Sequence, residues 1–155
     1  MTDCTEITKR LFFQAKMLTI GMAAAVFIYG TLAYYLVQAG RGVPAALDLR
    51  AYPWIQYALL VFSVVGILAM HRLRERILRQ EVTPQAGDTR YPQKLFVAAV
   101  LMMAAAEMPV FFGLVLVFVG RSFCVFLPFA FLSLAAFYFA FPRKQQWEDW
   151  LGTAF

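Results

Sequence analysis

Four long apolar runs constrain this chain more than any other feature of its sequence. They cover residues 17–39, 53–73, 95–119 and 122–141, and each approaches or exceeds the roughly 20 residues that a helix needs to cross a bilayer. Only 15% of the residues are charged, whereas soluble domains average about 25%. We therefore predict an all-α fold: one polytopic membrane domain over residues 1–155, with four transmembrane helices arranged as two antiparallel hairpins.

The first apolar run could be mistaken for a cleaved signal peptide. Its length exceeds the roughly 7–15 apolar residues of a signal-peptide core. Asp3 and Glu6 also dilute the positive charge that precedes it. We therefore expect this run to remain in the protein as the first transmembrane helix.

Lysine and arginine residues are distributed unequally between the two ends of the predicted helices. The N-terminal tail with the start of the first run, the connection over residues 72–94 and the C-terminal tail together carry 11 of them, and the opposite side carries three. Positive residues accumulate on the cytoplasmic side of membrane proteins. We predict that both termini face the cytoplasm and that the chain is a multi-pass protein of a bacterial inner (plasma) membrane.

Two segments outside the apolar runs have their own character. Residues 72–94 form a basic inner linker, which is expected either to lie against lipid headgroups or to dock a cytoplasmic partner. Residues 143–155 are expected to form a short helix lying in the inner headgroup layer, with Trp147 and Trp150 at the interface. Binding of a partner through the same tryptophan face is the alternative.

One carboxylate interrupts the third apolar run near its middle. Glu107 lies about 12 residues, or roughly 18 Å, from either end of that run, which is too far for a glutamate to reach water. An ionised carboxylate in lipid is costly, and such residues usually mark functional sites. Glu107 is expected either to carry a proton or to face inward and find partners, which makes it our candidate ion-binding residue. The alternative role is a hydrogen bond that only packs two helices together.

Depth in the membrane selects the side chains that can reach Glu107. Ser63 and Ser133 lie in the middle of the second and fourth runs, and Tyr29 and Thr31 lie near the centre of the first. Hydroxyl groups can hydrogen-bond to a carboxyl group across a helix interface. No lysine or arginine occurs at matching depth in the sequence. We therefore expect a neutral carboxyl group or a cation taken from solution, and no ion pair within the chain.

Small residues and one proline accompany these polar groups. Gly21 and Ala25 form a small-xxx-small pair, and Gly30 and Gly113 also leave room for helices to approach closely. Pro109 removes one backbone hydrogen bond from the third helix. That loosening is expected either to admit water or an ion beside the carboxyl group or only to kink the helix.

The segment "EMPVFFGLV", residues 107–115, resembles the carboxylate-bearing segment of the proteolipid subunits that form the c-type ring of rotary ATPases. In that family a glutamate is followed by a small residue or proline, an aromatic residue and G-L-V, and it binds the transported proton or sodium ion. The resemblance implies the same role for Glu107. The chain differs from the family in lacking a glycine-rich helix and in placing Glu107 on the first helix of its hairpin. As a whole, the chain resembles a small four-span protein of the bacterial inner membrane.

Two hypotheses of function follow from these features. The first is a proton- or cation-handling protein, active as a homo-oligomer or in a larger complex, with Glu107 as the titrating site. The second is a non-catalytic accessory or assembly subunit of a larger membrane complex. The sequence has no histidine or cysteine beside the buried carboxylate and no glycine-rich phosphate loop, so we expect no enzyme, cofactor or metal site. The lipid bilayer accounts for the basic clusters, and we expect no nucleic-acid partner.

Overall fold

The computed structural model describes residues 2–39, 52–79, 90–145 and 147 of the chain. These described residues are almost entirely helical and contain no strand. Four long helices account for most of them, and one short 3-10 turn precedes the last helix. Their bounds are α1 (Thr2–Ala39), α2 (Pro53–Arg79), α3 (Arg90–Gly120), η1 (Phe123–Val125) and α4 (Phe126–Ala140).

Each of the four helices is long and apolar enough to cross a membrane when η1 is counted with α4. In a bilayer the backbone groups of such a segment must be satisfied within it, and a helix does this. The predicted all-α class and the four candidate membrane spans are therefore confirmed. The qualifying segments are Glu6–Ala39, Pro53–Ile77, Gln93–Gly120 and Phe123–Ala140.

α1 extends well beyond the apolar run that it contains. It has 38 residues, or about 57 Å at about 1.5 Å per residue, which exceeds the roughly 30 Å hydrocarbon core of a bilayer. Its additional N-terminal turns are charged, and Arg10 and Glu6 form an exposed ion pair there with an N–O distance of 2.9 Å. The first turns of α1 are thus suited to water rather than lipid.

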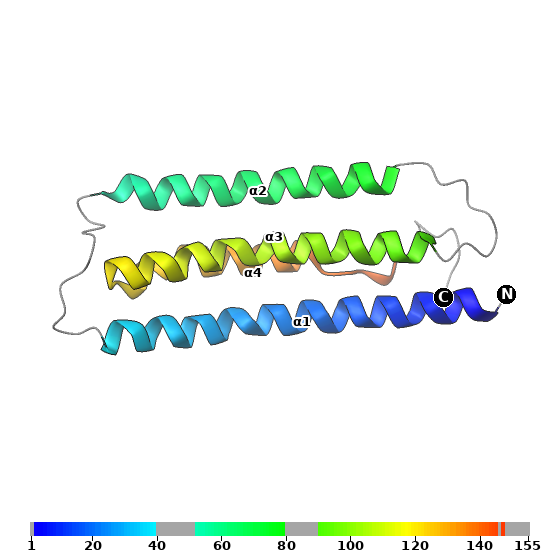
Figure 1. The fold of residues 1–155 in the computed structure, drawn as a ribbon, viewed down its shortest axis with the longest axis horizontal. Coiled ribbons are helices and arrows are strands. Elements are labelled where there is room, and N and C mark those ends of the chain that lie inside the picture. Colours follow the sequence, from blue (N-terminus) through cyan, green and yellow to red (C-terminus); the bar gives the residue numbers. More distant parts are fainter. Residues whose placement is uncertain (1, 40–51, 80–89, 146, 148–155) are drawn as a thin grey trace.

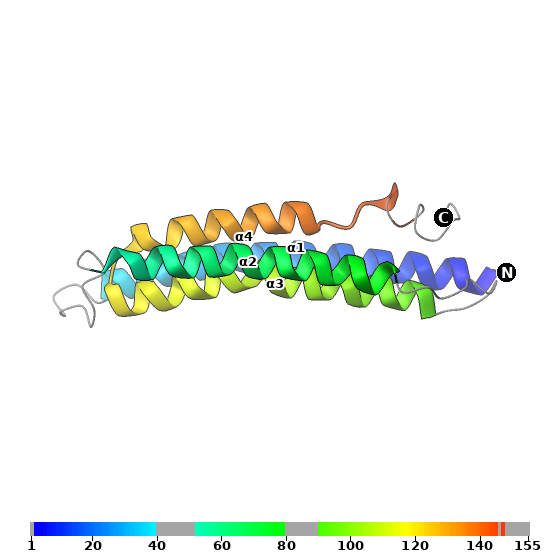
Figure 2. The ribbon, with the colours of Figure 1, turned by 90° about the horizontal axis from the view of Figure 1, so that it is seen from above.

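α3 occupies the centre of the bundle. α1 and α2 lie on opposite sides of α3, and α4 covers a third side of it (Figures 1 and 2). α4 also contacts α1, whereas α2 packs chiefly on α3. α1 and α2 run in opposite directions with α3 between them, while α3 and α4 lie side by side (Figure 1).

Basic side chains gather at one end of the bundle. α1 and α3 begin at the same end at which α2 and α4 finish (Figure 1). We call it the basic end, because the described residues there include Lys9, Arg72, Arg76, Lys94 and Arg143.

The buried core lies between α1, α3 and α4. Its largest fully buried side chains include Met103 and Val110 of α3. A second, smaller cluster joins Leu116 of α3 and Phe129 of α4 to partly buried side chains of α2. Ser63 is the only described side chain of α2 that is buried. Bulky apolar side chains cover the outward faces of all four helices. Such a surface is unfavourable in water and is suited to contact with lipid tails or with other membrane helices.

Glycines mark the closest packing of the bundle, although not at every predicted position. A Cβ atom on Gly113 would lie 2.8 Å from the Cβ atom of Phe129, and one on Gly30 would lie 3.5 Å from the ring of Phe126. Gly21, in contrast, has no atom within 4 Å of the corresponding position. The predicted packing role of Gly21 is therefore not fulfilled by the described helices of one chain.

The connection between α3 and α4 depends on Arg121. Its backbone N–H donates to the carbonyl of Val117 at 2.8 Å, and its φ of 53° lies in the left-handed region that usually takes glycine at a helix end. Its guanidinium group lies 3.5 Å from the carbonyl oxygen of Leu36 near the end of α1. The same side chain therefore links the turn to a neighbouring helix, which offsets part of the cost of its backbone conformation.

Candidate functional site

Glu107 of α3 meets Tyr29 of α1 in the middle of the bundle. The Tyr29 hydroxyl donates a hydrogen bond to Oε1 of Glu107 at 3.3 Å, and the pair is half-buried. The Tyr29 ring also packs on Phe111, with ring centroids 5.2 Å apart. Phe111 lies four residues after Glu107 and therefore on the same face of α3. This aromatic contact holds the phenol along α3 with its hydroxyl beside the carboxylate.

Local sequence explains why Tyr29 faces α3. Val26 and Ala33 are buried on α1 and belong to the cluster that includes α3 residues, and Tyr29 lies between them at helical spacing. The small side chain of Ala33 lets the two helices approach, and a phenol is long enough to reach past the interface. Tyr29 is thus the hydroxyl, among the four proposed from sequence, that the structure brings to Glu107.

The other three hydroxyls have backbone partners. Ser63 and Thr31 each donate to the carbonyl four residues earlier in their own helix, at 2.7 and 3.0 Å, which is common for such residues inside helices. Ser133, fully buried on α4, donates to the carbonyl of Ala106 on α3. None of the three donates to Glu107, and Thr31 is exposed on another face of α1.

Pro109 lies inside α3, and the helix continues through it. The missing N–H of proline deprives the carbonyl of Ala105 of its usual partner. Ser133 donates to the next carbonyl along, that of Ala106. The turn that carries Glu107 is therefore contacted by polar groups of two neighbouring helices, the Tyr29 hydroxyl from α1 and the Ser133 hydroxyl from α4.

The carboxylate has no positively charged partner among the described residues. The ion pairs found there lie elsewhere, between Arg10 and Glu6 and between His71 and Glu75, and both are exposed. A carboxyl group at this depth with one neutral donor can be stabilised by binding a proton or a small cation.

The C-terminal segment differs from the sequence interpretation. Trp147 is 3% exposed, because its ring packs edge-on against Phe12 of α1, with centroids 5.4 Å apart. Its indole is thus covered by the protein and does not present itself to lipid headgroups as expected. Trp150, most of the predicted helix over residues 143–155 and much of the basic linker fall outside the described residues.

Two residues of the α1–α3 interface were not anticipated from sequence. Phe111 orients Tyr29, and its spacing of four from Glu107 is the signal that identifies it. Thr19 is buried on α1, where it donates to the carbonyl of Ala15 at 2.8 Å and lies 3.4 Å from the sulfur of Met103. No pattern in the sequence separates Thr19 from an ordinary threonine in an apolar helix.

Comparison of the chain with models of known protein families, with curated proteins and with solved structures gives no match. The resemblance of residues 107–115 to rotary ATPase proteolipids stays a prediction from sequence.

Proposed function

We propose that the chain is a multi-pass protein of the bacterial inner membrane that handles protons or small cations, with both termini in the cytoplasm. Glu107 is the group that binds and releases the ion. The observation that carries this proposal is the half-buried hydrogen bond between Tyr29 and Glu107, formed in a helix long and apolar enough to cross a membrane.

The chemistry of the Tyr29–Glu107 pair favours binding and release of an ion at Glu107 over a purely structural hydrogen bond. A tyrosine hydroxyl is a neutral donor, so it leaves the negative charge of an ionised Glu107 uncompensated. Its separation of 3.3 Å from the carboxylate is longer than the roughly 2.5–3.0 Å usual for O–H···O bonds. A proton or a small cation can therefore neutralise Glu107 without breaking a strong existing interaction.

An oligomer completes the site. Glu107 and Tyr29 are only half-buried in one chain, and the neighbouring Met108 is exposed. A second copy packed against the α1–α3 face would enclose the carboxylate and provide the other wall of an ion pathway.

The second candidate function is that of an accessory subunit of a larger membrane complex. α2 favours it, because this helix packs chiefly on α3 and leaves most of its apolar surface exposed. In such a complex a basic group of the partner pairs with Glu107, which compensates a charge that this chain leaves unpaired.

Reconstitution of the purified full chain into vesicles tests these roles. The vesicles contain a pH-sensitive dye and receive an acid or sodium pulse, and the variant is Glu107→Gln. We expect ion flux to fall at least tenfold while the oligomer stays intact. Glu75→Gln is the matched control, because this carboxylate is exposed beyond the apolar part of α2, and it should leave flux unchanged.

Tyr29→Phe supplies a graded test of the same site. It removes one hydrogen bond worth about 1 kcal/mol in a membrane interior, which corresponds to roughly a fivefold change in apparent ion affinity. Equal ion flux in the wild type and in the Glu107→Gln variant would contradict ion handling by Glu107. If the wild type and Glu107→Gln both show no flux, and the variant loses proteins that co-purify with the wild type, the result would support the accessory role. If Glu107→Gln changes neither ion flux nor co-purification, helix packing would be the remaining role of Glu107.

A further inference from the structure

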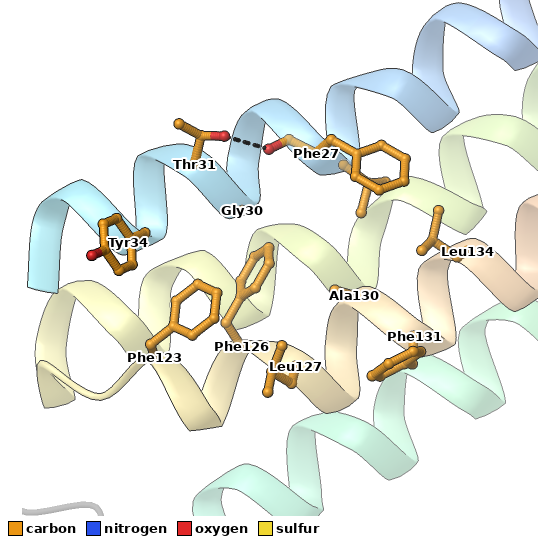
Figure 3. A pocket seen from close by; sticks show the side chains of 11 residues that line it. Phe27, Gly30, Thr31, Tyr34, Phe123, Phe126, Leu127, Ala130, Phe131 and Leu134 are labelled. Atoms are coloured by element: carbon orange, nitrogen blue, oxygen red, sulfur yellow. Dashed lines mark hydrogen bonds between the residues drawn. The ribbon is translucent and has the colours of Figure 1, made fainter.

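A groove runs between α1 and α4 on the outside of the bundle. It consists of two hollows of about 500 and 900 Å³ that share Phe27 of α1 and Leu134 of α4. Figure 3 shows the smaller hollow, where the rings of Phe123 from η1 and Phe126 from α4 lie near the α1 turn that contains Gly30. The larger hollow continues from there toward the basic end and reaches Arg143.

The larger hollow has an apolar floor and a basic mouth. On α1 it is lined by Thr19, Ile20, Ala23 and Ala24 before Phe27. Lys16 lies three residues before the first of these and four before the second, so it belongs to the same face of α1. Its side chain is exposed, as is that of Arg143.

One aromatic contact positions both basic residues. Trp147 packs on Phe12 at a centroid distance of 5.4 Å, and the backbone N–H of Trp147 donates to the carbonyl of Arg143 at 3.3 Å. Arg143 is therefore one helical turn from Trp147, and Lys16 is one helical turn from Phe12. Arg143 lines the larger hollow, and Lys16 lies on the face of α1 that leads into it, so both cationic side chains can reach an anion at its mouth.

We propose that this groove binds one anionic phospholipid of the leaflet at the basic end. Lys16 and Arg143 contact the phosphate, and one acyl chain lies in the larger hollow. The α1 residues along that hollow, from Thr19 to Phe27, extend over about 12 Å at about 1.5 Å per residue. That length is close to half of the roughly 30 Å hydrocarbon core, as expected for a chain from one leaflet. The proposal requires the helices to span a bilayer, and it does not depend on Glu107.

Charge distinguishes a lipid from a second copy of the chain as the occupant of the groove. A copy inserted in the same orientation would bring its own basic end, and its like charges would repel Lys16 and Arg143. No acidic side chain lines either hollow among the described residues, whereas a phosphate complements two cations.

Native mass spectrometry of the full chain in a mild non-ionic detergent tests the proposal. Phosphatidylglycerol and phosphatidylcholine are the probes, titrated separately against the wild type and the variant K16Q/R143Q. Each basic residue near an anionic lipid contributes about 1 kcal/mol, so the double variant should bind phosphatidylglycerol roughly 30-fold more weakly. Binding of phosphatidylcholine should be weak in both proteins.

Two further variants separate the groove from general surface charge. R72Q/R76Q removes the same charge from exposed positions on α2 at the same end and should leave phosphatidylglycerol binding unchanged. Ala24→Phe fills the exposed groove wall without changing charge and should weaken binding as strongly as the charge variant.

Three outcomes would overturn the proposal. The first is equal binding of the two lipids by the wild type, and the second is an equal loss of binding in R72Q/R76Q. The third is an Ala24→Phe variant that binds lipid normally or that changes the oligomeric state instead. That last result would identify the groove as an interface between copies.

Discussion

The substitution Gly113→Ala probes the tightest contact between α3 and α4. The added methyl group would lie 2.8 Å from the Cβ atom of Phe129 and 3.2 Å from a ring carbon of Phe126. Carbon atoms in contact prefer about 3.5–4.0 Å, so α3 and α4 must separate locally by up to about 1 Å. Phe129 cannot avoid the contact by changing rotamer, because its Cβ atom is fixed to the backbone of α4.

The expected cost follows from two opposing effects. Forcing an extra carbon into a packed interface costs about 1–3 kcal/mol, while alanine is favoured over glycine in a helix by up to about 1 kcal/mol. Gly21→Ala provides the matched control, because no atom lies within 4 Å of its added methyl group. The helix-propensity gain is the same for both variants, so their difference in unfolding free energy isolates the packing cost of about 1–3 kcal/mol.

Unfolding in mixed micelles by titration with sodium dodecyl sulfate, followed by circular dichroism, measures this difference. Gly113→Ala should unfold at a lower fraction of the denaturing detergent than Gly21→Ala, and Gly113→Leu at a lower fraction still. Equal unfolding free energies for the two alanine variants, within about 0.5 kcal/mol, would refute the close approach of α3 and α4 at this position.

Three more predictions concern other parts of the chain. Ser133→Ala should lower the unfolding free energy by about 0.5–2 kcal/mol, because the hydrogen bond from α4 to the Ala106 carbonyl of α3 is lost; Ser133→Thr, which keeps the hydroxyl, is the comparison, and an unchanged unfolding free energy in the alanine variant would contradict the bond. Trp147→Ala should speed tryptic cleavage of the C-terminal segment, since it removes the packing on Phe12; an unchanged rate would mean that this contact does not hold the segment. Cys124 is exposed beside the α3–α4 turn, so a membrane-impermeant maleimide should label it from the outer face of intact spheroplasts in a Cys4→Ser chain. Labelling only after lysis would reverse the proposed orientation.

The sequence predicted the helices well because length and hydropathy alone determine a membrane span. It also placed Glu107 and Tyr29 at the same depth, since depth follows from counting residues along each helix. It did not predict the N-terminal extension of α1, because the charged turns before residue 17 carry no apolar pattern that distinguishes a helix from a tail.

The sequence could not show which face of each helix is buried. In a water-soluble bundle, polar residues mark the outer faces, but here the outward positions, such as Phe27 and Phe131, are as apolar as the core position Phe129. The sequence therefore could not predict that α3 is central, that Gly21 has no close neighbour or that Thr31 faces outward. Serine and threonine hydroxyls can also bond to their own helix, as Ser63 does, so depth alone could not determine their partners.

The central place of α3 has a consequence for biogenesis. Because α1 and α2 lie on opposite sides of it, each would enter the bilayer during synthesis before its main docking surface exists. Both would have to persist as separately inserted helices until the third emerges from the ribosome and recruits them. Assembly of the bundle thus depends on the arrival of a late segment, and a chain truncated before residue 90 should leave two unassociated hydrophobic helices for membrane quality-control proteases to remove.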